Sequence, residues 1–165
     1  MTTTLTRTTK KTTNPRIKTT YHPNLVETKE ANRLFGYFEK TIQWEDGVKS
    51  KNGFTRKAKM MNIDDDPELY MIVCKVLKTL EMKNRVLGVY MNHYRTGLEY
   101  TPNHSHIGMF QVIISLGVTR TLMIGKKAFP QNSGDVTVFG SVVHGVPREP
   151  QIEDGRISIA LFLEK

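Results

Sequence analysis

Apolar residues recur at helical spacing in two segments of the first half of the chain. In the first segment, Thr28 to Trp44, the apolar positions are Ala31, Leu34, Phe35, Phe38 and Ile42. In the second segment they are Leu69, Ile72, Val73, Val76, Leu77 and Leu80. Asp66 and Pro67 precede the second segment as a suitable N-cap and first helical residue. Both segments are therefore predicted to be amphipathic helices that pack on a flat surface.

The segment between these two helices is polar. Residues 45–66 contain glycines and carry three bases near their middle, Arg56, Lys57 and Lys59. This composition is typical of an exposed loop or a short hairpin. We expect such a loop to be able to cover a substrate.

After residue 85 the pattern changes to short runs of alternating polarity, bounded by Gly, Pro, Asn or Ser. The runs predicted to be β-strands are Val86–Tyr94, Phe110–Val118, Arg120–Ile124, Asp135–Phe139 and Arg156–Leu163. Helices followed by many short strands indicate an α+β fold, in which a sandwich or barrel is covered by helices on one side.

The chain has 165 residues and a net charge of +8, and this length suits one domain. Residues 1–20 hold ten threonines and five of the bases but no acid, so the remainder carries only +3. The first twenty residues cannot bury enough apolar surface to offset their ordering entropy. We predict a disordered basic arm over residues 1–20 and a folded domain over residues 21–165. Such an arm can bind nucleic acid or keep the protein soluble.

Several classes of protein are excluded by what the sequence lacks. It has no run of about 18 apolar residues and no apolar N-terminal segment, so we expect an intracellular, monomeric protein without a membrane span or secretion signal. The single cysteine, Cys74, excludes an internal disulfide and a CxxC zinc site. We predict that Cys74 is a small buried residue of the second helix rather than a nucleophile.

Three histidines are candidate metal ligands. His104 and His106 are two residues apart, and in an extended chain this spacing points both side chains to the same face. His144 follows 40 residues later, at the end of a predicted strand. Neutral imidazoles on one face can chelate a metal ion, and the alternative is that they are surface or hydrogen-bonded histidines.

A second candidate group lies on the last strand. Alternation places Arg156, Ser158, Ala160 and Phe162 on one face of it. If this face is buried, Arg156 needs an anionic partner such as a carboxylate ligand, because an unpaired buried charge is costly. The alternative is an exposed arginine at a strand end.

Another strand offers polar groups to the same ligand. Asn92 and Tyr94 share a face of the strand Val86–Tyr94, where they present an amide and a phenol. His93 is predicted to face away from both of them.

The run from Asn92 to His106 resembles the AlkB-type iron(II) and 2-oxoglutarate dioxygenases, which carry NxYxxGxD followed by an HxD metal motif at this spacing. Further similar segments follow in the family's order. They are Ile114–Arg120 (SLGxxR), Gly134–Phe139, His144–Pro147 (HxVP) and Arg156–Phe162 (RISLTF). The resemblance covers about residues 21–163, with weaker matches at Ile42–Glu45 and Arg56–Lys57.

This resemblance implies a double-stranded β-helix, or jelly roll, with helices packed on one sheet. It implies that His104 and His144 bind iron(II), with His106 as the third ligand at the position of the family's aspartate. It also implies that 2-oxoglutarate is bound by Arg156, Tyr94, Ser158 and Asn92. No catalytic residue is expected beyond the metal ligands.

The activity implied by the resemblance is oxidative demethylation of N-methylated bases in DNA or RNA. Arg56, Lys57 and Met61 would then contact the nucleic acid. The sequence departs from the family pattern at His106, at Phe162, where many members have a second arginine, and at Met60 and Met61, where demethylases carry an aromatic residue. Two alternatives therefore stay open: a 2-oxoglutarate hydroxylase of a protein or small molecule, and an inactive relative that binds nucleic acid or 2-oxoglutarate.

Overall fold

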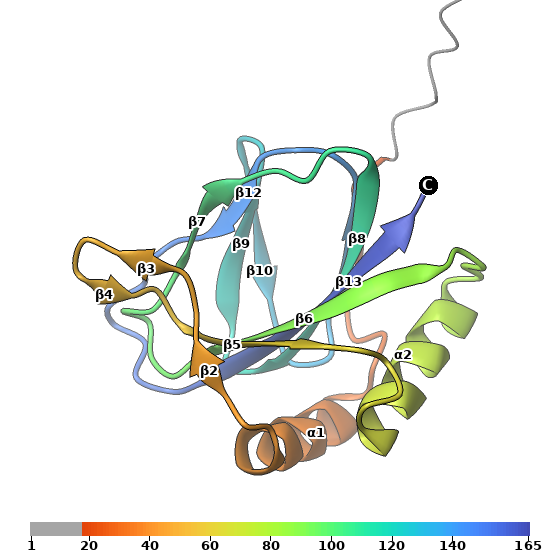
Figure 1. The fold of residues 1–165 in the computed structure, drawn as a ribbon, viewed down its shortest axis with the longest axis horizontal. Coiled ribbons are helices and arrows are strands. Elements are labelled where there is room, and N and C mark those ends of the chain that lie inside the picture. The colour runs from red at the N-terminus through yellow and green to blue at the C-terminus, as the bar shows by residue number, and fades with distance from the viewer. Residues whose placement is uncertain (1–17) are drawn as a thin grey trace, which may run out of the picture.

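Two β-sheets face each other, and two helices cover the outer face of the larger sheet (Figure 1). The computed structural model describes residues 18–165, so most of the predicted arm lies outside the described residues, while Thr20 already belongs to the first strand. The elements are β1 (Thr20–His22), α1 (Thr28–Thr41), β2 (Glu45–Asp46), β3 (Lys49–Ser50), β4 (Gly53–Phe54), β5 (Lys57–Met61), α2 (Pro67–Thr79), β6 (Val86–Tyr94), β7 (Thr101–His104), β8 (Met109–Gly117), β9 (Arg120–Ile124), β10 (Lys127–Gln131), β11 (Val136–Phe139), β12 (His144–Val146) and β13 (Arg156–Glu164).

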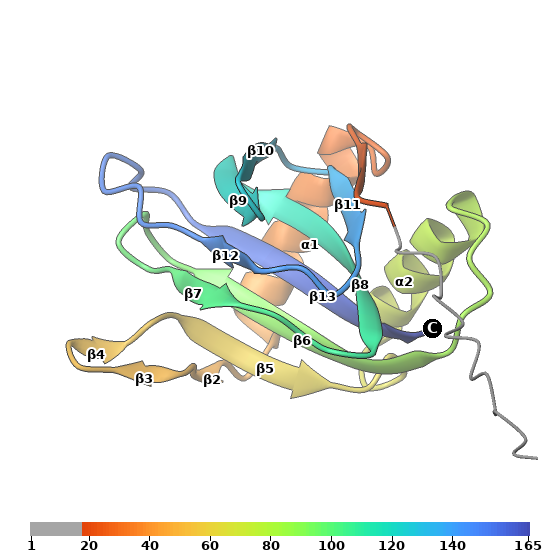
Figure 2. The same ribbon diagram turned by 90° about the horizontal axis from the view of Figure 1, so that it is seen from above.

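All neighbouring strands in the described residues pair antiparallel. The larger sheet has the order β1-β11-β8-β13-β6-β5-β2, the smaller sheet has the order β10-β9-β12-β7, and β3 and β4 form a separate hairpin. The smaller sheet faces the side of the larger sheet that the helices leave free (Figures 1 and 2). This arrangement leaves room for a site between the sheets.

The two predicted helices form where the apolar spacing places them. α1 buries Ala31, Leu34 and Phe38 completely. α2 begins at Pro67, and its N-cap is Asp66, whose Oδ1 accepts hydrogen bonds from two backbone N–H groups of the first turn. A carboxylate at this position satisfies otherwise unpaired donors and is favoured by the helix dipole.

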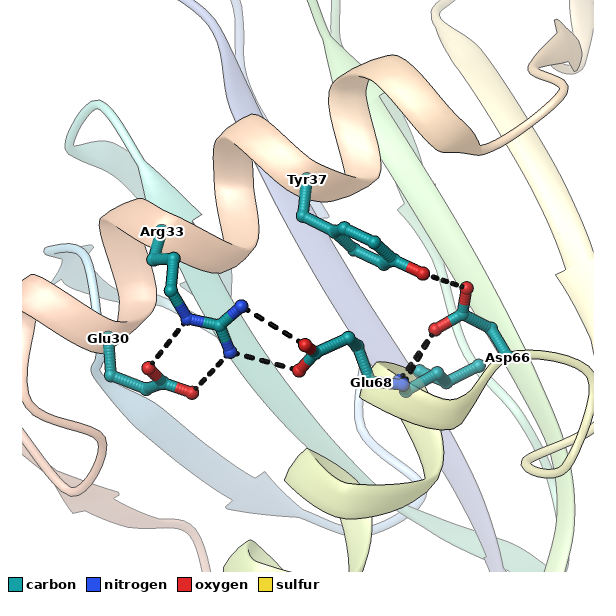
Figure 3. A network of polar contacts seen from close by, with 6 residues as sticks. Glu30, Arg33, Tyr37, Asp66 and Glu68 are labelled. Carbon is teal, nitrogen blue, oxygen red and sulfur yellow. Dashed lines mark hydrogen bonds and ion pairs between the residues drawn. The ribbon is translucent and has the colours of Figure 1, made fainter.

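Polar contacts tie the two helices together (Figure 3). Arg33 of α1 pairs with Glu30 on its own helix and with Glu68 of α2. The Tyr37 hydroxyl donates to Asp66 Oδ2 over 2.8 Å. Because the ion pairs are exposed they contribute little to stability, but they fix how the capped end of α2 meets α1.

Side chains of the last strand, β13, point alternately to the two sides of the larger sheet. Ile157, Ile159, Leu161 and Leu163 point toward the helices and belong to the larger hydrophobic cluster. Arg156, Ser158, Ala160 and Phe162 point between the sheets, as predicted, and line a cavity there. Since β13 lies at the centre of the larger sheet, between β6 and β8, its inner face forms the middle of that cavity's floor.

Three predictions need correction. Residues 45–66 are not only a loop: β3 and β4 form the expected hairpin, but β5 joins the larger sheet beside β6. Cys74 is exposed rather than buried, because it follows Val73 and so lies about 100° around the helix from the buried stripe. The strands β7 and β10 were not predicted because they are short, contain proline and form the edges of the smaller sheet.

A buried guanidinium holds the loops at one end of the sandwich. Arg120 is completely buried, and its Nε donates to Glu149 Oε2 over 2.9 Å. Its two terminal nitrogens donate to the backbone carbonyls of Thr96, Glu99 and Pro147. Each of the three guanidinium nitrogens thereby donates at least one hydrogen bond, which compensates the cost of burying the charge.

Glu149→Gln is expected to lower the free energy of unfolding by about 2 kcal/mol at pH 7, since it removes charge-assisted hydrogen bonds. Burial alone raises the pKa of Glu149, but hydrogen bonds from Thr121 and Arg120 outweigh it and lower that pKa. The resulting stability is complete above the ordinary pKa of glutamate, about 4.3, and is lost as the pH falls below it. Urea unfolding at pH 7 and pH 3.5 measures this, with the exposed Glu153→Gln as control. An equal loss in both variants would contradict the account.

Within residues 18–165, neither helix is long and apolar enough to cross a bilayer.

Candidate active site

A cavity of about 290 Å³ lies between the two sheets. Its wall combines side chains of both sheets with residues of the β2–β3 connection and of the segment after β7. The lining residues are Val48, Arg56, Met60, Tyr90, Asn92, Tyr94, Thr101, His104, His106, Gln111, Ile113, Leu122, His144, Gly145, Val146, Arg156, Ser158, Ala160 and Phe162. No aspartate or glutamate is among these described residues, so the cavity wall carries positive but no negative charge.

The three predicted metal ligands meet on one wall of this cavity. His104 at the end of β7 lies directly opposite His144, which begins β12 and does not end a strand as predicted. His106 follows two residues after β7, and its ring lies 4.9 Å from that of His104, centroid to centroid. One ligand nitrogen of each histidine lies within 4.8 Å of the others. The spacing suits three ligands of a single metal ion.

Hydrogen bonds fix the tautomers of two of these histidines. His104 Nδ1 and His144 Nδ1 each lie 2.8 Å from a backbone carbonyl oxygen, of Pro102 and Val142 respectively. A carbonyl oxygen only accepts, so each Nδ1 carries the proton and each Nε2 keeps its lone pair for a metal. Burial lowers the pKa of His144 to about 4, so this imidazole is neutral at pH 7. Burial also lowers the pKa of His106.

The close approach of His104 and His144 across β7 and β12 depends on Gly145. A Cβ atom at position 145 would lie 2.6 Å from Asn103 Oδ1 and 2.8 Å from the carbonyl oxygen of Thr101. These distances are shorter than van der Waals contacts, so a larger residue would push β12 away from β7. Gly145 therefore allows the two strands to approach closely enough to bring the histidines together.

Arg156 forms the opposite, inner part of the cavity. Its side chain is buried, and Nε donates to Ser115 Oγ over 2.8 Å. Its two terminal nitrogens are sealed from solvent and have no hydrogen-bond partner among the described residues. Burial lowers the pKa of Arg156 to about 10, which still leaves it protonated at pH 7. The alternative of an exposed arginine is therefore wrong: this is a buried cation with two unused donor groups.

The other predicted cosubstrate residues lie on the same face. Tyr94 places its ring 5.4 Å from the Arg156 guanidinium carbon, and its hydroxyl shares a 2.6 Å hydrogen bond with Thr101 Oγ1. Asn92 Nδ2 donates to Ser158 Oγ over 3.2 Å. His93 points to the helix side, near Trp44, as expected. The structure thus brings Asn92, Tyr94, Arg156 and Ser158 together, and their binding role stays a prediction.

The three residues predicted to contact nucleic acid do not form one surface. Arg56 is buried in the cavity, where its Nε donates to Asn92 Oδ1 over 2.6 Å. Lys57 and Met61 share the other face of β5, because they lie opposite His93 and Val89, which point toward the helices. Lys57 pairs with Asp46 over 2.6 Å. The placement of Met61 in the substrate site is therefore corrected: Met60 is the methionine that lines the cavity.

Three polar residues of the site were missed from the sequence. Gln111 and Ser115 are polar positions four residues apart on β8, on the face opposite the strand's residues of the larger cluster, Phe110, Val112, Ile114 and Leu116. Gln111 Nε2 lies 3.5 Å from His144 Nε2, and Ser115 anchors Arg156. Their spacing within an apolar strand was a usable signal. Thr101, the partner of Tyr94, gave no such signal because it precedes a proline in an unpredicted strand.

Solved structures share this arrangement of sheets and helices. The chain is similar to a Pseudomonas putida prolyl-4-hydroxylase, with a TM-score of 0.63 and 10% identity over 89% of this chain and 92% of that one. It is similar to the non-heme α-ketoglutarate-dependent epimerase SnoN of nogalamycin biosynthesis, with a TM-score of 0.70 and 10% identity over 89% and 76% of the two chains. It is also similar to HygX from Streptomyces hygroscopicus, solved with nickel and 2-oxoglutarate, with a TM-score of 0.66 and 10% identity over 88% and 82%.

These likenesses establish the fold. The described residues form the jelly roll seen in 2-oxoglutarate oxygenases, with two helices on one sheet, which confirms the predicted fold class. No family model matches the sequence, and no curated protein matches it.

Proposed function

We propose that this protein is a metal- and 2-oxoglutarate-dependent oxygenase. The observation that carries the proposal is the pairing of three convergent histidines with a buried arginine whose terminal nitrogens are unpaired, in one cavity. An unpaired buried charge is costly, and the cavity offers no carboxylate to compensate it. A dicarboxylate in this cavity would satisfy the guanidinium of Arg156 with one carboxylate and leave its other end for a metal that the three histidines would hold.

The donor set fits iron(II). Imidazole nitrogens bind first-row divalent metals such as iron, nickel and zinc. His104, His106 and His144 would hold such an ion through three nitrogens, and the ion could take further ligands from the cavity. Structures similar to this chain that hold nickel with 2-oxoglutarate, or depend on α-ketoglutarate, support the same pairing here.

Bound iron and 2-oxoglutarate supply the oxidation itself: 2-oxoglutarate and O₂ give succinate and CO₂, with one oxygen atom inserted into a C–H bond of the substrate. The residues of this chain orient the reactants. Arg156, positioned by Ser115, holds the distal carboxylate, with Tyr94 and Ser158 beside it. The terminal nitrogens of Arg156 are sealed from solvent, which limits water around a carboxylate bound there and strengthens these contacts.

His106 stands where the AlkB-type dioxygenases have an aspartate, and this difference changes the charge of the proposed metal centre. Three neutral imidazoles leave a divalent ion at +2, whereas two histidines and a carboxylate leave +1. The buried Arg156 and Arg56 add further positive charge to the cavity. This centre therefore favours anionic ligands more strongly than a site with a carboxylate does.

Two substrate classes follow from the proposal. The ordered motifs from Asn92 to Phe162 support the AlkB-type reading, oxidation of N-methyl groups on nucleic acid. The positions of Lys57 and Met61, which point away from the cavity, and the prolyl-hydroxylase and small-molecule enzymes of the same fold support hydroxylation of a small molecule or protein. The geometry favours the second class, because it leaves the predicted nucleic-acid contacts divided between two faces.

A succinate-release assay tests the proposal. The full chain is incubated with iron(II), 2-oxoglutarate and oxygen, alone and with either a methylated oligonucleotide or a panel of small organic acids. We expect slow succinate formation without substrate and at least about tenfold stimulation by one class. Absence of succinate under all conditions, in protein shown to contain iron, would contradict the oxygenase proposal.

A further inference from the structure

We infer that Arg56 is a second anion receptor inside the cavity, and that it binds a carboxylate or phosphate group of the primary substrate. The inference rests on the proposed function in one respect, that Arg156 is occupied by 2-oxoglutarate. It narrows the substrate to a small molecule with an anionic oxygen group, and it departs from the expectation that Arg56 contacts phosphates on an outer surface.

Arg56 is held in a fixed direction with one donor group unused. It is 6% exposed and immediately precedes β5. Its Nε donates to Asn92 Oδ1 over 2.6 Å and its Nη1 donates to Thr55 Oγ1 over 2.9 Å. Nη2 makes no hydrogen bond to any other described residue, and it is not sealed from solvent as the Arg156 nitrogens are. The charged group therefore keeps a donor available in the cavity that it lines.

Asn92 holds Arg56 in place through its side-chain amide. Its amide oxygen accepts from Arg56 and its amide nitrogen donates to Ser158 Oγ, so both ends of the side chain have a partner in the protein. The resemblance assigns Asn92 to the cosubstrate, but these contacts assign it to positioning Arg56. An arginine held by a buried amide loses less entropy when it binds an anion.

The two guanidiniums are anchored on different strands of the larger sheet, Arg56 on Asn92 of β6 and Arg156 on Ser115 of β8. Asn92, Ser158 and Ser115 occupy one row across β6, β13 and β8, because Ser158 lies opposite both of the others in the register. Adjacent strands are about 4.8 Å apart, so the backbones that carry Asn92 and Ser115 are separated by roughly 10 Å. One cavity thus contains two separate anion-binding groups.

The cavity itself limits the size and charge of what Arg56 binds. A volume of about 290 Å³ is at the lower end for small-molecule sites, and 2-oxoglutarate takes part of it. Among the described lining residues two are arginines and none is acidic, so a neutral or cationic substrate would leave Arg56 unpaired after water is displaced. The surroundings near the opening, Val48, Met60 and Tyr90, offer apolar contacts to the carbon skeleton of an organic acid.

Side-chain NMR of the full chain tests this inference without turnover. The protein is loaded with Zn²⁺, which is diamagnetic, and saturated with N-oxalylglycine, an unreactive analogue of 2-oxoglutarate. The arginine Nε–H signals are then followed during titration with butyrate or with propyl phosphate, and with butylammonium as a cationic control. We expect the Arg56 signal to shift and saturate as an anion is added, while the Arg156 signal stays unchanged. Butylammonium is expected to shift neither signal. The two anions separate a carboxylate-bearing from a phosphate-bearing substrate.

Two variants complete the test. Arg56→Gln is expected to weaken binding of the anion by about tenfold or more, and Arg56→Lys is expected to weaken it less. Lys57→Gln, which removes the same charge from the neighbouring residue on the other face of β5, is expected to bind like the wild type. Unchanged N-oxalylglycine affinity in Arg56→Gln shows that the fold is intact.

Three results would overturn the inference. They are an Arg56 signal that saturates with N-oxalylglycine alone, an anion affinity that is equal in wild type and Arg56→Gln, and a response that follows Lys57 as strongly as Arg56. Failure of N-oxalylglycine to bind the wild type would instead count against the oxygenase proposal, and the anion titration would still report on Arg56 by itself.

Discussion

Arg156→Met is expected to weaken 2-oxoglutarate binding by about 100-fold or more, and at the same time to leave the free protein as stable as the wild type or more stable. Both effects follow from the two terminal nitrogens that are buried without a partner. In the complex they form charge-assisted hydrogen bonds with a carboxylate, which methionine cannot replace. In the free protein they cost on the order of 1–3 kcal/mol, which methionine removes while filling similar volume.

Calorimetric titration of 2-oxoglutarate and urea unfolding measure the two effects on the same variant. Arg148→Met is the matched control, because it removes a guanidinium that packs on Tyr100 at an exposed position. We expect the control to keep its affinity for 2-oxoglutarate. Normal 2-oxoglutarate binding by the Arg156 variant would contradict the role of this arginine in the complex. A loss of several kcal/mol of stability would show that it has another partner in the free protein.

His104→Ala and His144→Ala are each expected to reduce affinity for a divalent metal by more than about 100-fold. The two residues face each other across β7 and β12, and each presents an Nε2 whose opposite ring nitrogen is bound to a backbone carbonyl. Loss of a positioning partner alone costs 10–100-fold in such sites, so loss of a ligand costs at least as much. Metal content after dialysis against iron(II) under nitrogen measures the effect.

Two further variants make the metal prediction specific. His22→Ala removes a histidine far from the cavity, whose ring contacts Thr20, and is expected to bind metal normally. His106→Asp restores two histidines and a carboxylate, and is expected to keep the metal, to bind iron(II) more tightly through the added negative charge, and to raise succinate formation. Loss of activity in His106→Asp would mean that the three-histidine centre is itself the working form. Undiminished metal binding in both alanine variants would exclude the proposed centre.

Alternation along the long strands predicted much of the site. β6 and β13 are neighbours in the larger sheet and pair without a register shift from Arg156 to Phe162, so the face shared by Asn92 and Tyr94, and the face shared by Arg156 and Ser158, could be assigned from a period of two. The helices were equally predictable, because a capping pair and an apolar stripe are local features. These positions depend on neighbours within the same element.

Residues whose positions depend on distant pairing were harder to place. Nothing local in the polar segment indicates that β5 pairs with β6, and this pairing puts Met60 rather than Met61 in the cavity and buries Arg56. A shift of one residue in this register would reverse the assignment. Likewise the approach of His144 to His104 depends on β7 and β12, two short strands that contain proline or glycine. The family resemblance, rather than the residue pattern, placed these histidines together.

The most direct measurement of the central claim is the calorimetric titration of 2-oxoglutarate into the full chain, with and without one equivalent of Mn²⁺. The proposal predicts one binding site per chain, with an affinity that the metal raises by about tenfold or more. It also predicts that this gain is absent in His144→Ala and that binding is about 100-fold or more weaker in Arg156→Met. Failure of the metal-loaded wild type to bind 2-oxoglutarate, or an affinity that is the same with and without metal, would contradict it.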